Sequence, residues 1–353
     1  MNRRILMRGV VAAGLVGGVM ALTGVTPAVA TDYQWVRTVS SFSYEPYPGI
    51  TSFGNVPSVA VDPAGNVWAD NWSQGFLVEF DGSGNNLASF AAVSFADSLS
   101  TDASGNIWVA GHDAAPHGVV TEFSNDGTVL LQLSSQNYSN HVLSWPSDVA
   151  VAPSGNIWVT EWANDNRFGL EKFGSDGTLL GLYGWQGTGS AQLWYPCGLT
   201  IDTSGNVWVS DSNNGRIVEF GNDGTILGQF GSPGSGNGQL SYAEGLAFDP
   251  AGNLWAADAG NNRIEEFSST GDYLGQFGEP GSGPGQFNNP EDLAFDAAGD
   301  LWVADTFNNR LQEFSPIPEP STLVLLAASA VSLLGYLWRR RATLLVQDND
   351  HRR

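Results

Sequence analysis

The chain has 353 residues, a single cysteine and a formal net charge of −22 at pH 7. A surface this acidic repels phosphate groups, which argues against nucleic acids and anionic lipid headgroups as partners. The lone Cys197 rules out an intramolecular disulfide, so packing must hold the fold together. Cys197 itself is either a small buried side chain or a reactive thiol.

The N-terminus has the pattern of a secretory signal peptide. Three arginines within the first eight residues precede an apolar run, and Ala28-Val29-Ala30 forms a small-x-small cleavage site. We therefore predict cleavage after Ala30 during export, with residues 1–30 as the signal peptide; the alternative is a retained membrane anchor. Because eight of the 14 basic residues lie near the two ends, region 31–318 keeps six basic residues against 33 acidic ones, a net charge of −27.

A unit of four short apolar runs, separated by Gly/Asn/Asp turn signals, recurs six times after residue 50. Such runs predict antiparallel strands joined by hairpins. Each copy carries a Gly-Asn/Asp-x-Trp signature, and the intervals between its tryptophans are 40, 50, 50, 47 and 47 residues. The six signature residues are Trp68, Trp108, Trp158, Trp208, Trp255 and Trp302. Four strands at this period predict an all-β, six-bladed β-propeller whose tryptophans pack between blades.

The last copy is one strand short, because Ser-Pro-Ile-Pro-Glu-Pro follows Phe314. Residues 34–42 alternate like a strand, and we predict that they close the ring as the outer strand of the last blade. The predicted propeller domain is 31–315. Its blades span 51–92, 93–140, 141–190, 191–237, 238–284 and 285–315.

The C-terminal segment, 316–353, begins with Pro318-Glu319-Pro320, continues with an apolar span at 322–338 and reaches three consecutive arginines. The span is just long enough for a transmembrane helix, whose arginines would stay cytoplasmic. The segment resembles the PEP-CTERM sorting signal, although 12 residues follow the arginines. The resemblance implies removal of the helix by an exosortase-type protease, and then display on the cell surface or release. The alternative is a permanent anchor, and the predicted membrane contact is through this helix alone.

The later copies share a longer sequence pattern, such as FGEPGSGPGQFNNPEDLAFDAAGDLWVADTFNNRLQEF at 277–314. This pattern resembles the NHL repeat, and the resemblance covers about 51–315. It implies a propeller, usually six-bladed, whose members include protein- and RNA-binding platforms and, among related propellers, a few enzymes. Fold alone therefore does not decide function.

The predicted topology brings the starts of the six innermost strands together at the mouth of a central channel. Five carboxylates fall at these starts: Asp97, Asp148, Glu244, Glu291 and Asp292. Converging oxygen ligands suit Ca²⁺, so one hypothesis is a calcium site. The alternative is a solvated acidic rim without an ion.

Other polar and aromatic residues have two interpretations. Repeated Asp/Asn/Arg sets such as Asp258/Asn262/Arg263 are either contacts for a partner or, as we expect because they repeat, structural turns. The other two sets are Asp211/Asn214/Arg216 and Asp305/Asn309/Arg310. Trp145, Trp185 and Trp194 lie outside the signature, in or beside connections between blades, and are candidate platforms for sugar rings.

The sequence thus favours an exported, non-catalytic binding or scaffold propeller with a protein or polysaccharide partner and no catalytic residues. The alternative is a divalent-metal lyase or lactonase. Related lyases imply histidine ligands or a histidine base, but His112, His117 and His141 fit no recognisable signature. Lactonase-like propellers imply carboxylates around a metal, for which Asp148, Glu244 and Glu291 are the candidates.

Overall fold

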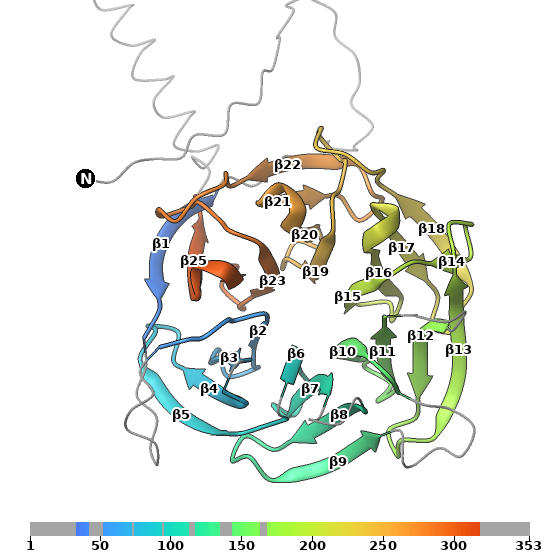
Figure 1. Ribbon diagram of the computed structural model, residues 1–353, viewed down its shortest axis with the longest axis horizontal. Helices are drawn as coiled ribbons and strands as arrows, with labels where there is room; N and C mark the ends of the chain where they lie inside the picture. The colour runs from blue at the N-terminus through green and yellow to red at the C-terminus, as the bar shows by residue number, and fades with distance from the viewer. Residues whose placement is uncertain are drawn as a thin grey trace, which may run out of the picture. The chain divides into compact units, whose positions relative to one another are not determined.

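The computed structural model describes residues 33–41, 52–72, 74–93, 95–112, 117–134, 143–162 and 168–317. Six separate antiparallel sheets surround a central axis, as Figure 1 shows along that axis. The chain completes one sheet before starting the next, so the sheets are the six predicted blades. In every blade the first strand lies innermost.

The strand bounds follow the predicted blades closely. Blade 1 contains β2 (Val59–Val61), β3 (Val67–Asn71), β4 (Phe76–Phe80) and β5 (Asn86–Ala91). Blade 2 contains β6 (Phe95–Thr101), β7 (Ile107–His112), β8 (Gly118–Phe123) and β9 (Val129–Ser134). Blade 3 contains β10 (Pro146–Val151), β11 (Ile157–Glu161), β12 (Phe168–Phe173), β13 (Leu179–Gln186) and a short fifth strand, β14 (Gln192–Leu193), parallel to β13.

The second half of the ring has the same order with an added turn of 3₁₀ helix after each second strand. Blade 4 contains β15 (Pro196–Ile201), β16 (Val207–Asp211), η2 (Ser212–Asn214), β17 (Arg216–Phe220) and β18 (Ile226–Phe230). Blade 5 contains β19 (Ala243–Phe248), β20 (Leu254–Asp258), η3 (Ala259–Asn261), β21 (Arg263–Phe267) and β22 (Tyr273–Phe277). Blade 6 contains β23 (Pro290–Phe295), β24 (Leu301–Asp305), η4 (Thr306–Asn308) and β25 (Arg310–Pro316).

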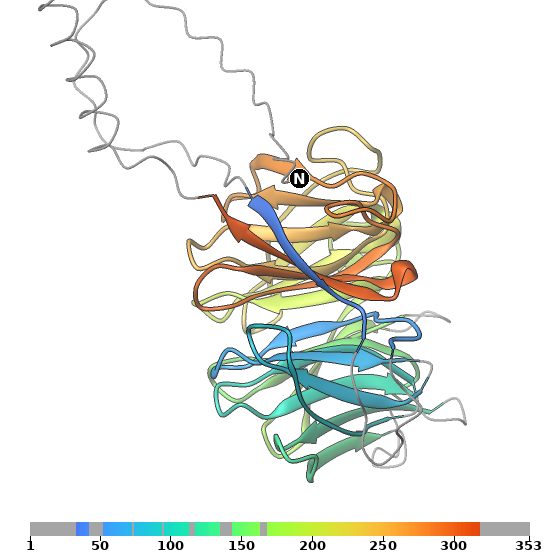
Figure 2. The same ribbon diagram turned by 90° about the vertical axis from the view of Figure 1, so that its left-hand side faces the viewer.

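The N-terminal strand β1 (Tyr33–Val39) completes blade 6 by pairing with β25, which confirms the predicted closure of the ring. Figure 2 shows the two strands side by side. Arg37 of β1 forms an ion pair with Glu313, and the Tyr33 hydroxyl donates to the Gly299 carbonyl at 3.1 Å. The strand spans 33–39 rather than the predicted 34–42, and residue 42 lies outside the described residues.

All six signature tryptophans are buried, as predicted. The register sets each one opposite a small residue of the first strand, as in Ala60 opposite Trp68 and Ala294 opposite Trp302. The apolar core divides into six clusters, one at each junction between neighbouring blades. Each blade is therefore held by packing against its neighbours, as expected where a single blade cannot cover both faces.

Blade 3 departs from the repeat where an acidic residue normally precedes the tryptophan. In blade 1, Asp62 accepts hydrogen bonds from the Asn66 amide and, at 3.4 Å, from the Trp68 indole. Blade 3 has Ala152 in the place of that aspartate, and the Trp158 indole nitrogen has no hydrogen-bond partner in the described part of the chain. Lys172 lies 5.1 Å from the centre of the Trp158 ring, where other blades carry a glutamate.

No helix within the described ranges is long and apolar enough to cross a membrane. The predicted signal peptide, the sorting residues Pro318, Glu319 and Pro320, and the predicted helix 322–338 all lie outside those ranges.

Candidate functional site

The starts of the innermost strands meet at one end of the channel, as predicted. They line a cavity of about 40 Å³ that includes all five predicted carboxylates, Asp97, Asp148, Glu244, Glu291 and Asp292, together with Cys197. Apolar and polar side chains of the same strands, Asp148 and Asp292 included, line a second cavity of about 310 Å³. The mouth cavity is small compared with the usual 300–1,000 Å³ of a small-molecule site. A large ligand at the mouth would therefore lie across it and not inside it.

Asp148 and Asp292 connect neighbouring blades through their carboxylate oxygens. Asp148 accepts from the Ser98 hydroxyl of blade 2 and, at 2.6 Å, from the Leu199 amide of blade 4. Asp292 accepts from the Ser58 hydroxyl at 2.5 Å and from the Val59 amide at 3.0 Å. Burial raises the pKa of both carboxyls, that of Asp292 to about 7. These two residues stabilise the ring at its axis.

Glu244, Glu291 and Asp97 are half-buried and lie between those links. Burial, and then the charge of Glu291, raises the pKa of Glu244 well above its usual range. Burial also raises the pKa of Glu291 to about 7, although its carboxylate accepts a hydrogen bond from the Asn289 amide. The pKa of Glu244 and that of Glu291 are thus both raised, first by burial and then by neighbouring negative charge.

Within the described ranges, no group of three or more His, Cys, Asp or Glu side chains is placed to hold a metal ion. Four of the five predicted calcium ligands, Asp97, Asp148, Glu291 and Asp292, already accept hydrogen bonds from the protein. The calcium site therefore stays a prediction from sequence.

Aromatic pairs bridge three consecutive blade junctions beside the mouth. At each junction, the residue after Asn71, Gly111 or Glu161, at or next to the end of the second strand, contacts an aromatic residue. That residue is at, or directly before, the start of the innermost strand of the next blade. Ring centres are 5.2 Å apart for Trp72–Phe95, 4.7 Å for His112–Trp145 and 6.2 Å for Trp162–Tyr195. We call these six residues the aromatic arc.

At the other three junctions, a small residue follows the second strand where the arc has a large ring. Ser212, Ala259 and Thr306 follow the second strands of blades 4, 5 and 6. The Ser212 hydroxyl donates to the Ala243 carbonyl at 2.5 Å, and the Thr306 hydroxyl donates to the Val56 carbonyl at 3.0 Å. The aromatic arc therefore breaks the repeat over half of the ring.

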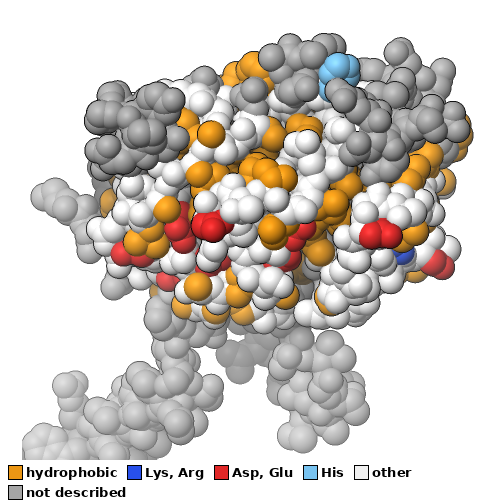
Figure 3. Space-filling view, turned by 90° about the horizontal axis from the view of Figure 1, so that it is seen from below, with side chains coloured by type: hydrophobic (Ala, Val, Ile, Leu, Met, Phe, Trp, Pro, Cys, Tyr) orange, Lys and Arg blue, Asp and Glu red, His pale blue; other side chains and the backbone are white. Residues whose placement is uncertain are grey.

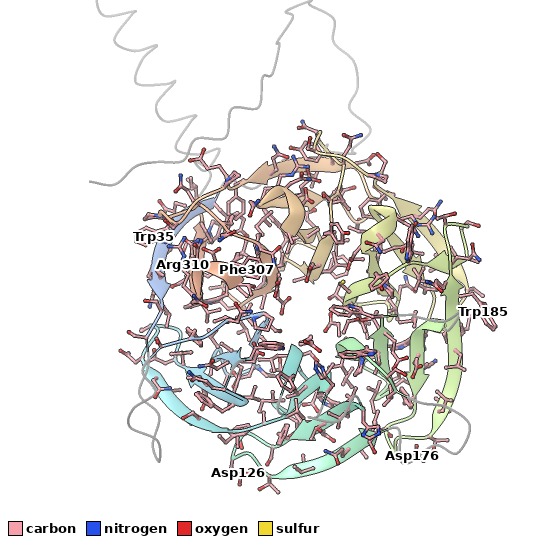
Figure 4. All side chains as sticks on the ribbon, viewed as in Figure 1. Trp35, Asp126, Asp176, Trp185, Phe307 and Arg310 are labelled. Atoms are coloured by element: carbon pink, nitrogen blue, oxygen red, sulfur yellow. The ribbon has the colours of Figure 1, made fainter. Side chains whose placement is uncertain are left out.

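The arc is partly open to solvent, and further aromatic residues extend it. Trp162 is 38% exposed, and Trp194, adjacent to Tyr195, is 39% exposed. Tyr242 precedes the innermost strand of blade 5 and is 59% exposed. Of the three tryptophans proposed from sequence, Trp145 belongs to the arc and Trp194 adjoins it, whereas Figure 4 shows Trp185 at the outer edge of the ring.

A histidine–aspartate pair lies in the middle of the arc, and the sequence analysis missed it. His112 Nδ1 is 3.3 Å from Asp97 Oδ2, and the Trp72 indole donates to Asp97 Oδ1 at 3.3 Å. The imidazole stacks on Phe95 with ring centres 4.9 Å apart and contacts Trp145 on the blade 3 side. Aligning the copies on the end of the second strand would have placed His112 between Trp72 and Trp162.

Cys197 is half-buried in the wall of the mouth. Burial, followed by the charge of Glu244, raises the pKa of its thiol. A thiol held in its protonated form is a poor nucleophile, which favours the structural interpretation of this cysteine.

The repeated Asp/Asn/Arg sets are structural, as expected. Asp258 accepts from the Ser241 amide, the Asn261 side chain and, at 2.7 Å, Arg263 Nε. The equivalent carboxylates, Asp211 and Asp305, are paired in the same way with Arg216 and Arg310. The left-handed residue of the turn is Gly215 in blade 4, and not the predicted Asn214; it is Asn262 and Asn309 in blades 5 and 6.

Family comparisons agree with the two resemblances. Residues 193–220 and 287–314 match the NHL repeat, and residues 316–341 match the PEP-CTERM protein-sorting motif. The chain thus carries NHL repeats and a sorting motif that indicates export to the cell envelope or surface. No curated protein matches the chain.

Several solved structures are similar to the propeller. A gluconolactonase from Xanthomonas campestris has a TM-score of 0.60 at 20% identity, over 81% of this chain and 90% of that one. A virginiamycin B lyase from Staphylococcus aureus has a TM-score of 0.51 at 19% identity, over 75% and 85%. A luciferin-regenerating enzyme has a TM-score of 0.55 at 15% identity, over 75% and 92%. At these identities the similarity establishes the fold and does not carry an activity.

Proposed function

We propose that this protein is an exported binding propeller that holds a neutral polysaccharide across the mouth of its channel. The observation that carries the proposal is the aromatic arc, which places rings at three consecutive blade junctions beside the mouth. Aromatic rings offer large apolar faces with few rotamers to order on binding. They suit the C–H faces of successive sugar rings in a polymer.

The acidic groups at the mouth fit the same ligand. Carboxylates accept hydrogen bonds from hydroxyl groups, and Asp97 and Glu244 line the mouth beside the arc. Figure 3 shows the side of the ring, where acidic side chains are prominent and basic ones scarce. An anionic polymer would be repelled, so the proposal is restricted to neutral chains.

The binding test uses the full-length protein in native gels that contain neutral xylan or mannan, with alginate as the anionic comparison. Neutral polymer should retard the protein, and alginate should not. W162A and Y195A should weaken retardation about tenfold or more, because the first removes an exposed ring of the arc and the second its half-buried partner.

F307A is the matched control, because Phe307 is 56% exposed in the turn after β24 but lies outside the arc (Figure 4). Wild-type retardation of W162A, or an equal loss in F307A, would show that the arc is not the binding surface. Retardation of W185A tests separately whether the binding surface extends to the outer edge of the ring.

We also propose that an exosortase-type protease removes the C-terminal segment at Pro318-Glu319-Pro320 after signal peptidase has cut behind Ala30. The sorting-motif match supports this route. Intact-mass measurement of the protein from an exosortase-positive host tests it. A mature chain that retains residues 342–353 would contradict C-terminal processing.

A further inference from the structure

We propose that His112 and Asp97 form a general base that hydrolyses acyl esters carried by the polysaccharide. This inference rests on the proposed binding function, because the arc must first hold the polymer beside the imidazole. It adds an activity that binding alone does not require. His112 is the proposed catalytic residue, and Asp97 and Trp72 are positioning residues.

The geometry is that of a base held by an orienting acid. Asp97 Oδ2 lies 3.3 Å from Nδ1 of His112, so Nε2 is the ring nitrogen left for proton transfer. The Trp72 indole donates to the other carboxylate oxygen at 3.3 Å, and Phe95 stacks on the imidazole with an angle of 13° between the rings. Asp97 and Phe95 of blade 2 thus orient the imidazole, and Trp72 of blade 1 holds Asp97 in place.

The pair reaches the mouth through Asp97, which lines the mouth cavity. The side chains of His112 and Asp97 are 15% and 26% exposed. Within the arc, His112 occupies the place taken by Trp72 and Trp162 at the flanking junctions. A sugar chain stacked along the arc would thus pass directly over the imidazole.

Water is the nucleophile that this arrangement suits. The nearby Ser98 hydroxyl already donates to Asp148, so it is not placed to attack a substrate. In the proposed step, Nε2 takes a proton from water as the water oxygen bonds to the ester carbonyl carbon. The bond from that carbon to the sugar oxygen then breaks, and the imidazolium returns its proton to the sugar oxygen. The products are a free sugar hydroxyl and a carboxylic acid.

The surroundings select neutral esters. Elimination on a uronic acid would bring another carboxylate to a mouth that already holds five, and repulsion disfavours it. The mouth cavity of about 40 Å³ admits a small acyl group while the polymer stays outside. Short acyl substituents such as acetyl are therefore the class that fits.

The test measures acetate released from acetylated xylan by the full-length protein. H112Q should lower kcat at least 100-fold, because general-base catalysis contributes about 10²–10⁴, whereas KM should rise about tenfold or less because one ring of the arc is lost as well. D97N should lower kcat about tenfold or more with KM unchanged, since the asparagine keeps an oxygen acceptor and only the orientation of the imidazole is lost. H117Q is the matched control and should keep the wild-type rate.

Retardation in gels of deacetylated xylan separates the two proposals. Wild-type protein that is retarded but releases no acetate above the no-protein rate overturns the esterase and leaves the binding function intact. Equal rates for wild type and H112Q overturn it as well. If H112Q does not fold, D97N decides, because the asparagine keeps an oxygen for Trp72; a change confined to KM in D97N would also overturn the proposal.

Discussion

The two halves of this ring close their blade junctions with different chemistry. From blade 1 to blade 4, ring-on-ring contacts such as Trp72–Phe95 cover the junctions at the mouth. From blade 4 back to blade 1, the small residues Ser212, Ala259 and Thr306 take the place of the rings, and each of these blades contains an Asp–Arg ion pair. Both halves build their blades on the same four antiparallel strands, so the fold does not require the aromatic residues. Positions that follow the repeat build the ring, and positions that break it at the mouth are free to serve a ligand.

The last residue of the second strand has one role that both halves share and a second role that only blades 4, 5 and 6 have. The last residue of the second strand accepts a backbone hydrogen bond from the loop before the first strand, as Asn71 does from Gly54 and Asp305 does from Asn288. In blades 4, 5 and 6 that residue is an aspartate that also binds a buried arginine. Arg263, for example, donates to the Gly236 and Gln239 carbonyls as well as to Asp258. In blade 1 it is the neutral Asn71, and in blade 3 it is Glu161.

The largest expected effect on stability comes from breaking an Asp–Arg ion pair in blades 4 to 6. D305A leaves Arg310 buried without its carboxylate, which should lower the free energy of unfolding by about 3–5 kcal/mol. N71A removes only neutral hydrogen bonds at the equivalent position and should lower it by about 1 kcal/mol. Urea unfolding of both variants checks the difference, and equal losses would mean that the two halves are stabilised alike.

The next effect concerns the acidic mouth that both halves share. The pKa of Glu291 is raised to about 7 in the folded protein, mainly by burial. A carboxyl whose pKa is raised on folding binds its proton more tightly when folded, so stability falls as pH rises from about 4.5 to 7. E291Q cannot ionise and should be more stable than wild type by about 1–2 kcal/mol at pH 8, but not at pH 4.

Thermal unfolding across this pH range measures that difference. Wild-type protein should itself lose stability over the same range, since Asp292 and Glu265, with pKa values of about 7 and about 8, add to the effect. A constant gap between E291Q and wild type from pH 4 to 8 would contradict the assignment.

The smallest expected effect on stability comes from restoring, in blade 3, the aspartate that the other blades carry before the signature tryptophan. A152D supplies the carboxylate that other blades place beside the signature indole, and the Trp158 nitrogen now lacks a partner within the described residues. One regained hydrogen bond should stabilise the protein by about 1 kcal/mol. The reverse change, D102A in blade 2, should destabilise it by a similar amount. Destabilisation by A152D would indicate that Lys172 and Trp158 together have already replaced the carboxylate.

The ring could be predicted from the sequence because every blade has the same turn signals and the same signature tryptophan. The spacing of Trp68 to Trp302 placed the six first strands, and therefore the five carboxylates at the mouth. The missing strand after Phe314 predicted closure by the N-terminus, although the strand begins and ends slightly earlier than expected.

The aromatic arc was not predicted, because its pairs join different blades. Trp162 and Tyr195 are 33 residues apart and meet only when two copies are set side by side. His112 was considered with His117 as part of one loop, whereas its partner Asp97 was considered as a metal ligand. Neither residue has a spacing signature, and only the register of β6 with β7 brings them together.

The pairing of β25 with β1 also limits where the chain can be cut without damage to blade 6. β25 ends at Pro316, and the sorting motif begins at the same residue. A cut ahead of that point would remove part of the sheet to which β1 is joined, whereas a cut after residue 317 would leave every described strand intact. The last strand of the fold and the sorting motif thus meet at Pro316, with no residues between them. A protease that worked before the last blade had joined β1 would release an open ring instead of a closed one.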